Sequence, residues 1–147
     1  MYKKKSLFVT FEGIEGSGKS YQSSKLYENV KKRRIPVILT REPGGTRSAE
    51  KIRKIILEDY FHLGSKVRFN KYTDTLLYLA ARSEHITDKI KPAISKRKII
   101  ICDRFIDSTL AYQVYGKGVN KSLVDSVQKY ILGSIKPDLT FVLKANI

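Results

Sequence analysis

The chain has 147 residues, which is enough for one domain with its own core and too few for two ordinary domains. Its composition, 41% hydrophobic and 10% aromatic, is typical of a soluble globular protein, and no stretch approaches the roughly 18 consecutive apolar residues of a membrane span. The net charge of +15 leaves two interpretations open: a solvated lysine-rich surface, or a surface that attracts polyanions such as nucleotides or nucleic acid.

The single cysteine and the basic start of the chain bear on where the protein works. Cys102 lies within an apolar run, so neither an intrachain disulfide nor a cysteine metal cluster is expected. Met1–Lys5 is basic, but a strand pattern follows it rather than a long apolar segment with a cleavage site, so we predict no export signal. We therefore expect a cytoplasmic protein.

The first predicted elements flank a glycine-rich segment. Leu7–Phe11 is apolar and predicts a strand, and Tyr21–Arg34 has apolar residues at helical spacing. Between them, Gly13–Ser20 matches the P-loop pattern G-x-x-x-x-G-K-[ST] at every fixed position. A chance glycine turn is the alternative, but strand, loop and helix come in the order that a P-loop requires.

The residue types of this loop suit nucleotide phosphates. Glycines let successive backbone N–H groups converge on phosphate oxygens. Lys19 supplies a positive charge for the β- and γ-phosphates, and Ser20 offers a hydroxyl to Mg²⁺. The residues expected to bind the phosphates are Gly13, Ile14, Glu15, Gly16, Ser17, Gly18, Lys19 and Ser20.

The next stretch predicts a strand, a polar loop and a helix. Ile35–Thr40 is continuously apolar and β-branched, which indicates a buried strand of a parallel sheet. Arg41–Thr46 then lies at the carboxyl end of that strand, where open parallel sheets bind ligands, and Thr46 is a good N-cap for a helix over residues 46–58. Residues 59–71 are expected to form a connection.

The rest of the chain continues the alternation of helices and strands. A helical pattern covers Tyr72–Lys96, and Pro92 is expected to kink it or to begin a new segment. Lys98–Asp103 predicts a strand, Ser122–Leu132 a helix, and Leu139–Leu143 a last strand. The expected fold is one α/β domain with a parallel sheet and helices on both faces.

An acidic residue, Asp103, ends the third predicted strand. At the tip of a sheet that carries a P-loop, such an acid resembles the second metal-organising element of P-loop enzymes. We therefore expect Ser20 and Asp103 to organise Mg²⁺. The alternative is that Asp103 caps the helix that follows.

Several stretches together resemble the bacterial thymidylate kinases, which transfer the γ-phosphate of ATP to dTMP. They are Phe11–Ser20, Thr40–Thr46, Leu76–Arg82 and Asp103–Gln113, and the resemblance spans nearly the whole chain. Many families share the P-loop, whereas the Arg-Glu-Pro-Gly-Gly-Thr loop and the Asp103–Gln113 stretch are specific. The resemblance implies the P-loop nucleoside monophosphate kinase fold, ATP and Mg²⁺ as cofactors, dTMP as acceptor, and a homodimer.

The resemblance also implies roles for individual residues. Lys19, Glu15, Arg104 and Arg41 would be catalytic, with the two arginines on the phosphate of dTMP and Glu15 near the 3′-hydroxyl. Tyr78 would stack on thymine. The residues implied to bind the substrate are Arg41, Tyr78, Arg82, Arg104, Ser108, Thr109, Tyr112 and Gln113.

Each of these assignments has a simpler alternative. The spacing of Tyr78 also fits core packing in a helix. Arg41 and Arg82 are also compatible with ordinary surface charges, and Ser108 and Thr109 with caps of the next helix.

The end of the chain departs from the family's pattern. The family continues past a strand such as Leu139–Leu143 with a lid and a closing helix, whereas this sequence ends at Ile147. Gly16 follows Glu15 where some members carry an arginine, and in the bacterial type the lid supplies that cation. We therefore expect a single P-loop kinase domain over residues 1–147, truncated before the lid, with weak or absent turnover.

Two other functions remain compatible with the sequence. One is phosphorylation of another nucleotide or nucleoside by a P-loop kinase. The other is a non-catalytic module that binds nucleotides or nucleic acid, which the positive charge favours. We expect dTMP and ATP as partners, a homodimer through an apolar helix face in residues 72–90, and neither nucleic acid nor a membrane.

Overall fold

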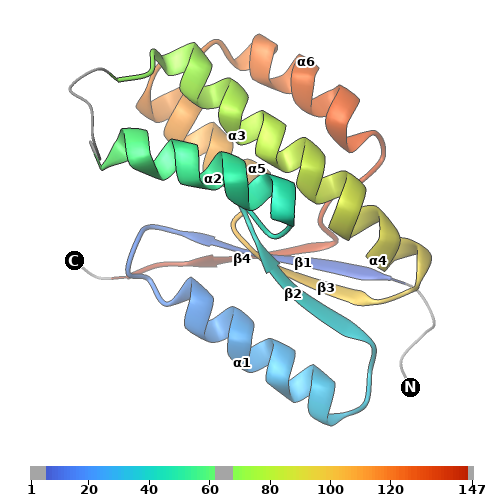
Figure 1. Cartoon of the computed structure of the whole chain (residues 1–147). Helices are drawn as coiled ribbons and strands as arrows, with labels where there is room; N and C mark the ends of the chain where they lie inside the picture. The colour runs from blue at the N-terminus through green and yellow to red at the C-terminus, as the bar shows by residue number, and fades with distance from the viewer. Residues whose placement is uncertain (1–5, 62–67, 146–147) are drawn as a thin grey trace.

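The computed structural model describes residues 6–61 and 68–145. Of the connection expected over residues 59–71, residues 62–67 therefore lie outside the described part. At the centre is a parallel sheet of four strands in the order β2-β3-β1-β4 (Figure 1). The strands are β1 (Leu7–Gly13), β2 (Val37–Arg41), β3 (Ile99–Asp103) and β4 (Leu139–Leu143).

Helices cover both faces of the sheet, as the sequence predicts. Of the helices in the described residues, α1 (Lys19–Lys32) lies on one face and the others lie on the opposite face (Figure 1). These are, in chain order, α2 (Arg47–Tyr60), α3 (Lys71–His85), the π-helical turn η1 (Ile86–Ile90), α4 (Lys91–Ser95), α5 (Ile106–Thr109), the π-helical turn η2 (Leu110–Gly116) and α6 (Lys121–Leu132). None of the described helices is long and apolar enough to cross a membrane.

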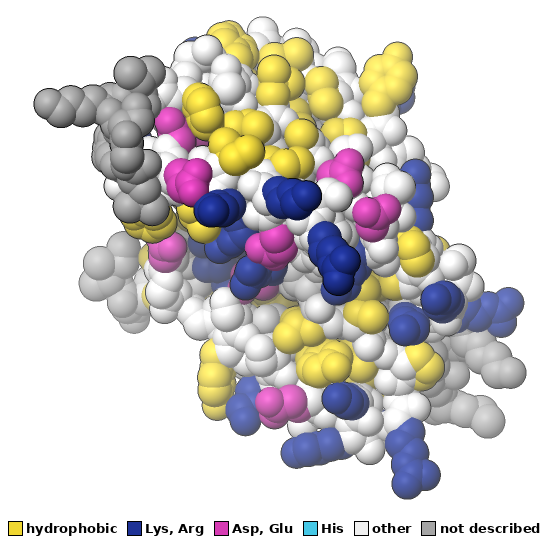
Figure 2. Space-filling model, in the orientation of Figure 1, with side chains coloured by type: hydrophobic (Ala, Val, Ile, Leu, Met, Phe, Trp, Pro, Cys, Tyr) yellow, Lys and Arg dark blue, Asp and Glu magenta, His cyan; other side chains and the backbone are white. Residues whose placement is uncertain are grey.

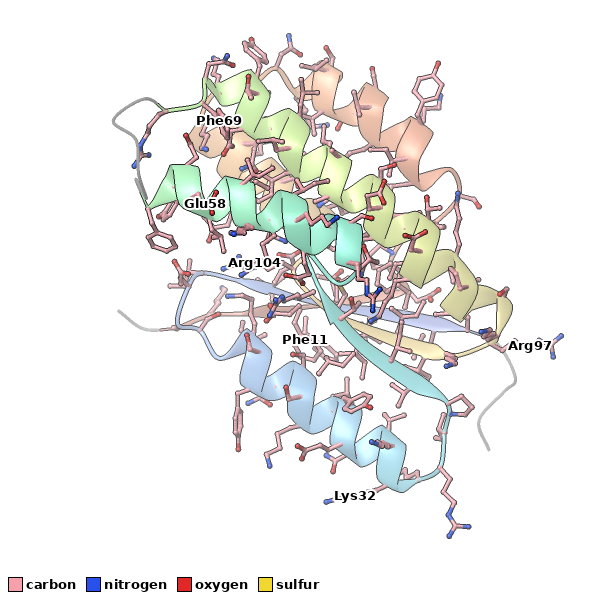
Figure 3. The ribbon with its side chains drawn as sticks, in the orientation of Figure 1. Phe11, Lys32, Glu58, Phe69, Arg97 and Arg104 are labelled. Carbon is pink, nitrogen blue, oxygen red and sulfur yellow. The ribbon has the colours of Figure 1, made fainter. Side chains whose placement is uncertain are left out.

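The two central strands are buried on both faces, which explains their continuous apolar sequence. Val9 and Phe11 of β1 pack toward Leu26 and Val30 of α1, and Figure 3 shows Phe11 between the sheet and α1. Phe8 belongs to the core on the other face, with Ile86, Ile90, Ile100, Cys102 and Phe105. Side chains that alternate along each strand therefore contribute to two separate cores.

The two edge strands are less buried than the sequence predicts. The strand expected over Ile35–Thr40 begins only at Val37, and its first residues are half-buried. Because β2 has a neighbour on one side only, the expectation of full burial was wrong there. On the opposite edge, Phe141 and Val142 of β4 are 44% and 67% exposed.

The long helix over residues 71–95 is divided as predicted near Pro92. Helix α3 ends at His85, the turn η1 has the wider π spacing, and α4 begins at Lys91 with Pro92 in its first turn. Because proline lacks an N–H and its ring clashes with the preceding turn of a regular α-helix, a widened turn directly before it lets the chain continue as a helix.

The carboxyl ends of β1, β2 and β3 meet at one edge of the sheet. Asp103 pairs in register with Phe11 on one side and with Arg41 on the other. The loops continue this connection, since the N–H of Arg104 donates to the carbonyl of Phe11 at 2.9 Å and the N–H of Glu42 to that of Asp103 at 3.0 Å. The P-loop, the Arg41–Thr46 loop and the start of α5 are thereby fixed next to one another.

Candidate active site

The loop between β1 and α1 has the backbone of an anion-binding nest. Gly13, Gly16 and Gly18 have φ angles of 141°, 74° and 87°, a region that favours glycine. Gly18 precedes α1 without a side-chain hydrogen bond at the cap, so the first N–H groups of the helix are not occupied by a capping side chain. The strand, loop and helix thus follow the predicted arrangement, which suits a phosphate group.

Lys19 lies beneath this loop rather than in solvent. Its side chain is only 6% exposed, and its ammonium donates to the carbonyl of Ile14 at 2.5 Å and to Ser17 Oγ at 3.4 Å. Burial lowers the pKa of Lys19, and the positive charge of Arg104 lowers it further. A cation held at this position gains most from an anionic ligand, which would replace its lost hydration.

Ser20 and Asp103, expected to organise a metal, are in contact. Ser20 Oγ donates to Asp103 Oδ2 at 2.5 Å, whereas Asp103 Oδ1 is buried without a hydrogen-bond partner among the described residues. The described part of the chain contains no cluster of three or more acidic, histidine or cysteine ligands. A hydroxyl and one carboxylate fit Mg²⁺, which takes few protein ligands when phosphates supply the rest.

The alternative assignment of Asp103 as a helix cap was wrong. Helix α5 begins at Ile106, its N-cap residue is Phe105, and no side chain bonds to that cap. Ser108 lies inside α5, and Thr109 stands at the N-cap position of η2 without a side-chain hydrogen bond to that helix. Their hydroxyls bind other side chains instead: Ser108 donates to Glu12, and Thr109 accepts from Arg82.

Arg104 reaches from the end of β3 toward the P-loop. Its backbone has a φ of 67°, and its Nη1 donates to the carbonyl of Gly13 at 3.2 Å and to Ser108 Oγ at 3.2 Å. The guanidinium lies 5.3 Å from the centre of the Tyr112 ring, whose hydroxyl it also contacts at 3.4 Å. Figure 3 shows Arg104 at the end of the sheet near the loop that leads into α1, far from Lys32 and Arg97 at the other end.

Glu12 is a buried acid at this point for which the sequence suggested no role. Its carboxylate accepts from the N–H of Phe105 at 2.7 Å and from Ser108 Oγ at 2.6 Å, and so joins the P-loop strand to the segment that carries Arg104. Burial raises the pKa of Glu12, although these hydrogen bonds partly oppose it. The sequence did contain a signal for Glu12, because it is an acidic residue directly after the apolar stretch Leu7–Phe11.

The loop after β2 holds Arg41 at the surface. Arg41 Nη2 donates to both oxygens of Glu50 at 3.2 Å, and Glu50 also accepts from the N–H of Gly45 at 2.9 Å. Burial of Glu50 would raise its pKa, but these contacts outweigh the effect and lower it. Arg41 is 54% exposed, so it is a surface charge with a fixed partner.

A cleft of about 330 Å³ opens beside Arg41. It lies between α1, β2 and η1, and it reaches Ser20 and Asp103. Lysine and arginine side chains, with acidic ones among them, gather in a band across the middle of the face seen in Figure 2. The residues that line the cleft are Ser20, Ser23, Ser24, Leu39, Thr40, Arg41, Gly45, Glu50, Lys89 and Asp103.

Arg82 is not a surface charge, so that alternative was wrong. The side chain is 3% exposed, and its guanidinium lies 5.2 Å from the centre of the Phe105 ring. Nε donates to Glu42 Oε2 at 2.7 Å, Nη2 to Thr109 Oγ1 at 2.9 Å, and Nη1 to Gln128 Oε1 at 2.5 Å. Residues of α3, α5, α6 and the loop after β2 thus meet at one guanidinium.

Behind Arg82 lies a chain of buried polar groups that sequence reasoning did not include. Glu42 Oε1 lies 2.9 Å from His85 Nδ1, and His85 Nε2 lies 2.7 Å from Thr40 Oγ1. Burial alone would raise the pKa of Glu42, but the charge of Arg82 and the hydrogen bond from His85 outweigh it and lower the pKa. A signal was present, since Arg82 and His85 are three residues apart on one helix.

The remaining predicted substrate residues differ in how far they are buried, and none of them lines the cleft beside Arg41. Tyr78 is half-buried, and burial raises its pKa to about 12. Gln113 is 3% exposed, and its amide contacts Asp74 at 3.4 Å, which also pairs with Lys117 at 2.6 Å. By contrast, Tyr112 is 46% exposed and Glu15 lies exposed in the P-loop.

A parallel sheet with a glycine nest at the carboxyl end of β1, a buried lysine beneath it and an acid at the end of β3 defines a P-loop nucleotide-binding protein. The family model of thymidylate kinase matches residues 11–147. The chain therefore belongs to the thymidylate kinase family.

Individual relatives agree with this family. The chain is 46% identical to thymidylate kinase of Halothermothrix orenii over 97% of its own length, and 48% identical to that of Roseiflexus castenholzii over 94%. It covers only 66% and 58% of those two proteins. The crystal structure of thymidylate kinase from Ehrlichia chaffeensis matches with a TM-score of 0.84 at 40% identity, over 97% of this chain and 78% of that one.

Proposed function

We propose that this chain holds the substrate-binding core of a kinase that phosphorylates dTMP to dTDP with ATP and Mg²⁺. The observation that supports the proposal is that Arg104 lies next to the P-loop and its lysine, Lys19. Arg104 donates to the carbonyl of Gly13 in the P-loop, and its charge also acts on Lys19. A donor phosphate in the loop and an acceptor phosphate on the arginine would therefore lie next to each other.

ATP would bind with its phosphates over the P-loop. The N–H groups of Gly13–Ser20 and the amino-terminal end of α1 would bind phosphate oxygens, and Lys19 would exchange its contact with the Ile14 carbonyl for the β- and γ-phosphates. When bound, Mg²⁺ would neutralise phosphate charge, and Ser20 and the unpaired oxygen of Asp103 would hold it.

The phosphate of dTMP would lie between Arg41 and Arg104. Guanidinium groups bind phosphate through two parallel hydrogen bonds, and Arg41 would have to leave Glu50 in part to do so. The attacking oxygen of dTMP is already anionic, so the reaction needs no strong general base. The protein's task is to bring two polyanions into line and to compensate their charge, which these arginines and Lys19 are suited to do.

The thymidine part would occupy the space between α3 and η2. Tyr78 supplies an aromatic face for the pyrimidine, and Arg82 has a fifth N–H donor beyond its contacts to described residues, which could reach the base. Thr109, Ser108 and Gln113 would lie around the nucleoside, with Tyr112 near the sugar and Glu15 near its 3′-hydroxyl. We also propose a homodimer, because Ile55 of α2 and Tyr72 and Leu76 of α3 expose apolar surface. A cytoplasmic location is proposed as well, because the chain has a single cysteine and so cannot form an intrachain disulfide.

The test is an assay of ADP release with ATP, Mg²⁺ and dTMP, run together with thermal shifts for each nucleotide. We expect stabilisation by dTMP and by ATP, and, whatever the level of turnover, ADP release that requires dTMP. Lys19→Ala should abolish stabilisation by ATP and leave that by dTMP. Stabilisation by thymidine or by another monophosphate in preference to dTMP would indicate a different kinase, and stabilisation by neither substrate would refute the proposal.

A further inference from the structure

Two buried residues have no assigned role: Glu42, which contacts Arg82, and His85, which contacts Glu42. Glu42 is 6% exposed and His85 is fully buried. Neither side chain borders the cleft beside Arg41. Their position, between the loop after β2 and helix α3, nevertheless connects Arg82 with the segment that carries Arg41.

The geometry defines which atoms donate. A carboxylate only accepts hydrogen bonds, and Glu42 stays ionised because its pKa is lowered, so Nδ1 of His85 must carry the proton that lies between them. Glu42 Oε2 lies 2.7 Å from both Nε and Nη2 of Arg82. His85 therefore orients the carboxylate that in turn fixes the plane of the guanidinium.

His85 also shapes the loop after β2. A Cβ added to Gly45 would lie 2.8 Å from Cδ2 and 2.9 Å from Nε2 of His85, and 2.5 Å from Thr40 Oγ1. The loop thus wraps closely around the imidazole, and the N–H of the same Gly45 binds Glu50, the partner of Arg41. One ring consequently supports both the arginine proposed for the base and the loop of the arginine proposed for the phosphate.

We propose that Glu42 and His85 are positioning residues for the acceptor nucleotide: through Arg82 and Gly45 they set the distance between the base contact and the phosphate contact of dTMP. This inference rests on the proposed function. The pair also places a negative charge beside Arg82, so the guanidinium can offer a hydrogen bond to an uncharged base without an unbalanced buried charge. The P-loop does not depend on these contacts, so ATP binding should be independent of them.

Two substitutions of His85 separate its two hydrogen bonds. The amide nitrogen of asparagine can replace Nδ1 as the donor to Glu42. The longer glutamine can place its amide where Nε2 lies, and the hydroxyl of Thr40, which both donates and accepts, can bond to it in either direction. His85→Asn therefore keeps the donor to Glu42, whereas His85→Gln keeps the contact to Thr40 and loses that donor. Glu42→Gln removes the charge at nearly constant size, and Glu58→Gln, in an exposed ion pair with Lys54 on α2, is the matched control.

The experiment is titration calorimetry of each variant with dTMP and, separately, with ATP. We expect His85→Gln and Glu42→Gln to weaken dTMP binding by about tenfold, with ATP affinity unchanged, and His85→Asn to remain within about threefold of the unsubstituted chain. Equal dTMP affinities for the two His85 variants, or equal losses for dTMP and ATP, would overturn the positioning role. Glu58→Gln should change neither affinity.

A second readout does not depend on any nucleotide. In NMR spectra of the free protein, the Nε–H of Arg82 should exchange slowly with water in the unsubstituted chain and in His85→Asn, and faster in His85→Gln and Glu42→Gln. If dTMP does not bind the unsubstituted chain, the proposed function fails, and the exchange rate still shows whether His85 and Glu42 fix the guanidinium of Arg82. Equally slow exchange in all variants would refute the positioning role. If a His85 variant folds poorly, the comparison of Glu42→Gln with the unsubstituted chain gives the same test.

Discussion

The P-loop takes its shape from one continuous stretch, Gly13–Ser20, whereas the cluster around Arg82 draws its side chains from Glu42, Thr109 and Gln128. The shape of the loop depends mainly on backbone N–H groups and on glycine backbone angles, and both are determined by the local sequence. In the cluster, buried charges must meet with correct geometry across several elements. The comparison indicates that the P-loop should tolerate substitutions elsewhere in the chain, whereas the cluster around Arg82 should not.

Removal of Arg82 should have the largest effect on stability, because it leaves Glu42 as a buried charge without its main partner. We expect Arg82→Leu to lower the free energy of unfolding by about 3–5 kcal/mol in urea titrations. Glu58→Gln breaks an exposed ion pair and should cost less than about 0.5 kcal/mol. Similar losses for the two variants would mean that the cluster is no more sensitive than the surface.

Two glycines of the P-loop test whether that loop is as local as the comparison assumes. A Cβ at Gly13 would lie 2.5 Å from the carbonyl oxygen of Leu143, whereas one at Gly16 would meet nothing within 4 Å. Gly13→Ala should therefore cost about 2 kcal/mol or more, through the clash with β4 together with the strain of a positive φ. Gly16→Ala should cost only about 1 kcal/mol, from the strain alone.

Urea titrations of both glycine variants give the measurement. Equal costs would mean that local backbone angles alone limit the loop. A larger cost at Gly13 would show that even this motif depends in part on the strand that closes the sheet.

The buried carboxylates of the two regions, Glu42 beside Arg82 and Glu12 beside the P-loop, should make opposite contributions to the pH dependence of stability. The pKa of Glu42 is lowered from 4.5, so the unfolded chain binds more protons below that value and stability should fall as pH decreases through the pKa of the folded state. The pKa of Glu12 is raised from 4.5, so the folded chain binds more protons and stability should fall as pH rises from 4.5 to the pKa of the folded state.

Unfolding free energies measured between about pH 3 and 7 would separate these contributions. In the plot of unfolding free energy against pH, Glu42→Gln should reduce the slope below pH 4.5, and Glu12→Gln should reduce the slope above pH 4.5. If each substitution changed the opposite side, the contrast between the two carboxylates would be wrong.

The smallest effect is expected at the hydroxyl of Tyr78. With a pKa raised to about 12, this group stays neutral, and the proposed stacking uses only the ring. Tyr78→Phe should change dTMP affinity by less than about twofold, whereas Tyr78→Ala should weaken it by about tenfold. Calorimetry with dTMP would test both, and a large loss in Tyr78→Phe would show that the hydroxyl contacts the ligand.

The sequence by itself predicted the sheet with helices on both faces, the P-loop, the Thr46 cap and the break at Pro92. Each depends on periodicity, on glycine or proline, or on short-range hydrogen bonds, and these are visible in neighbouring residues. It overestimated the burial of Ile35–Thr40, because strand order alone decides which strand lies at the edge.

Only the tertiary structure decided the surroundings of the charged residues. Arg82 and Arg41 look alike in sequence, yet one is 3% exposed and the other 54%. Glu12, Glu42 and His85 acquired their places from partners that lie 40 or more residues away in the chain, with separations of 96, 40 and 45 residues to Ser108, Arg82 and Thr40. Local pattern shows that a residue is polar, but only the packed fold shows which groups replace the water that it loses on burial.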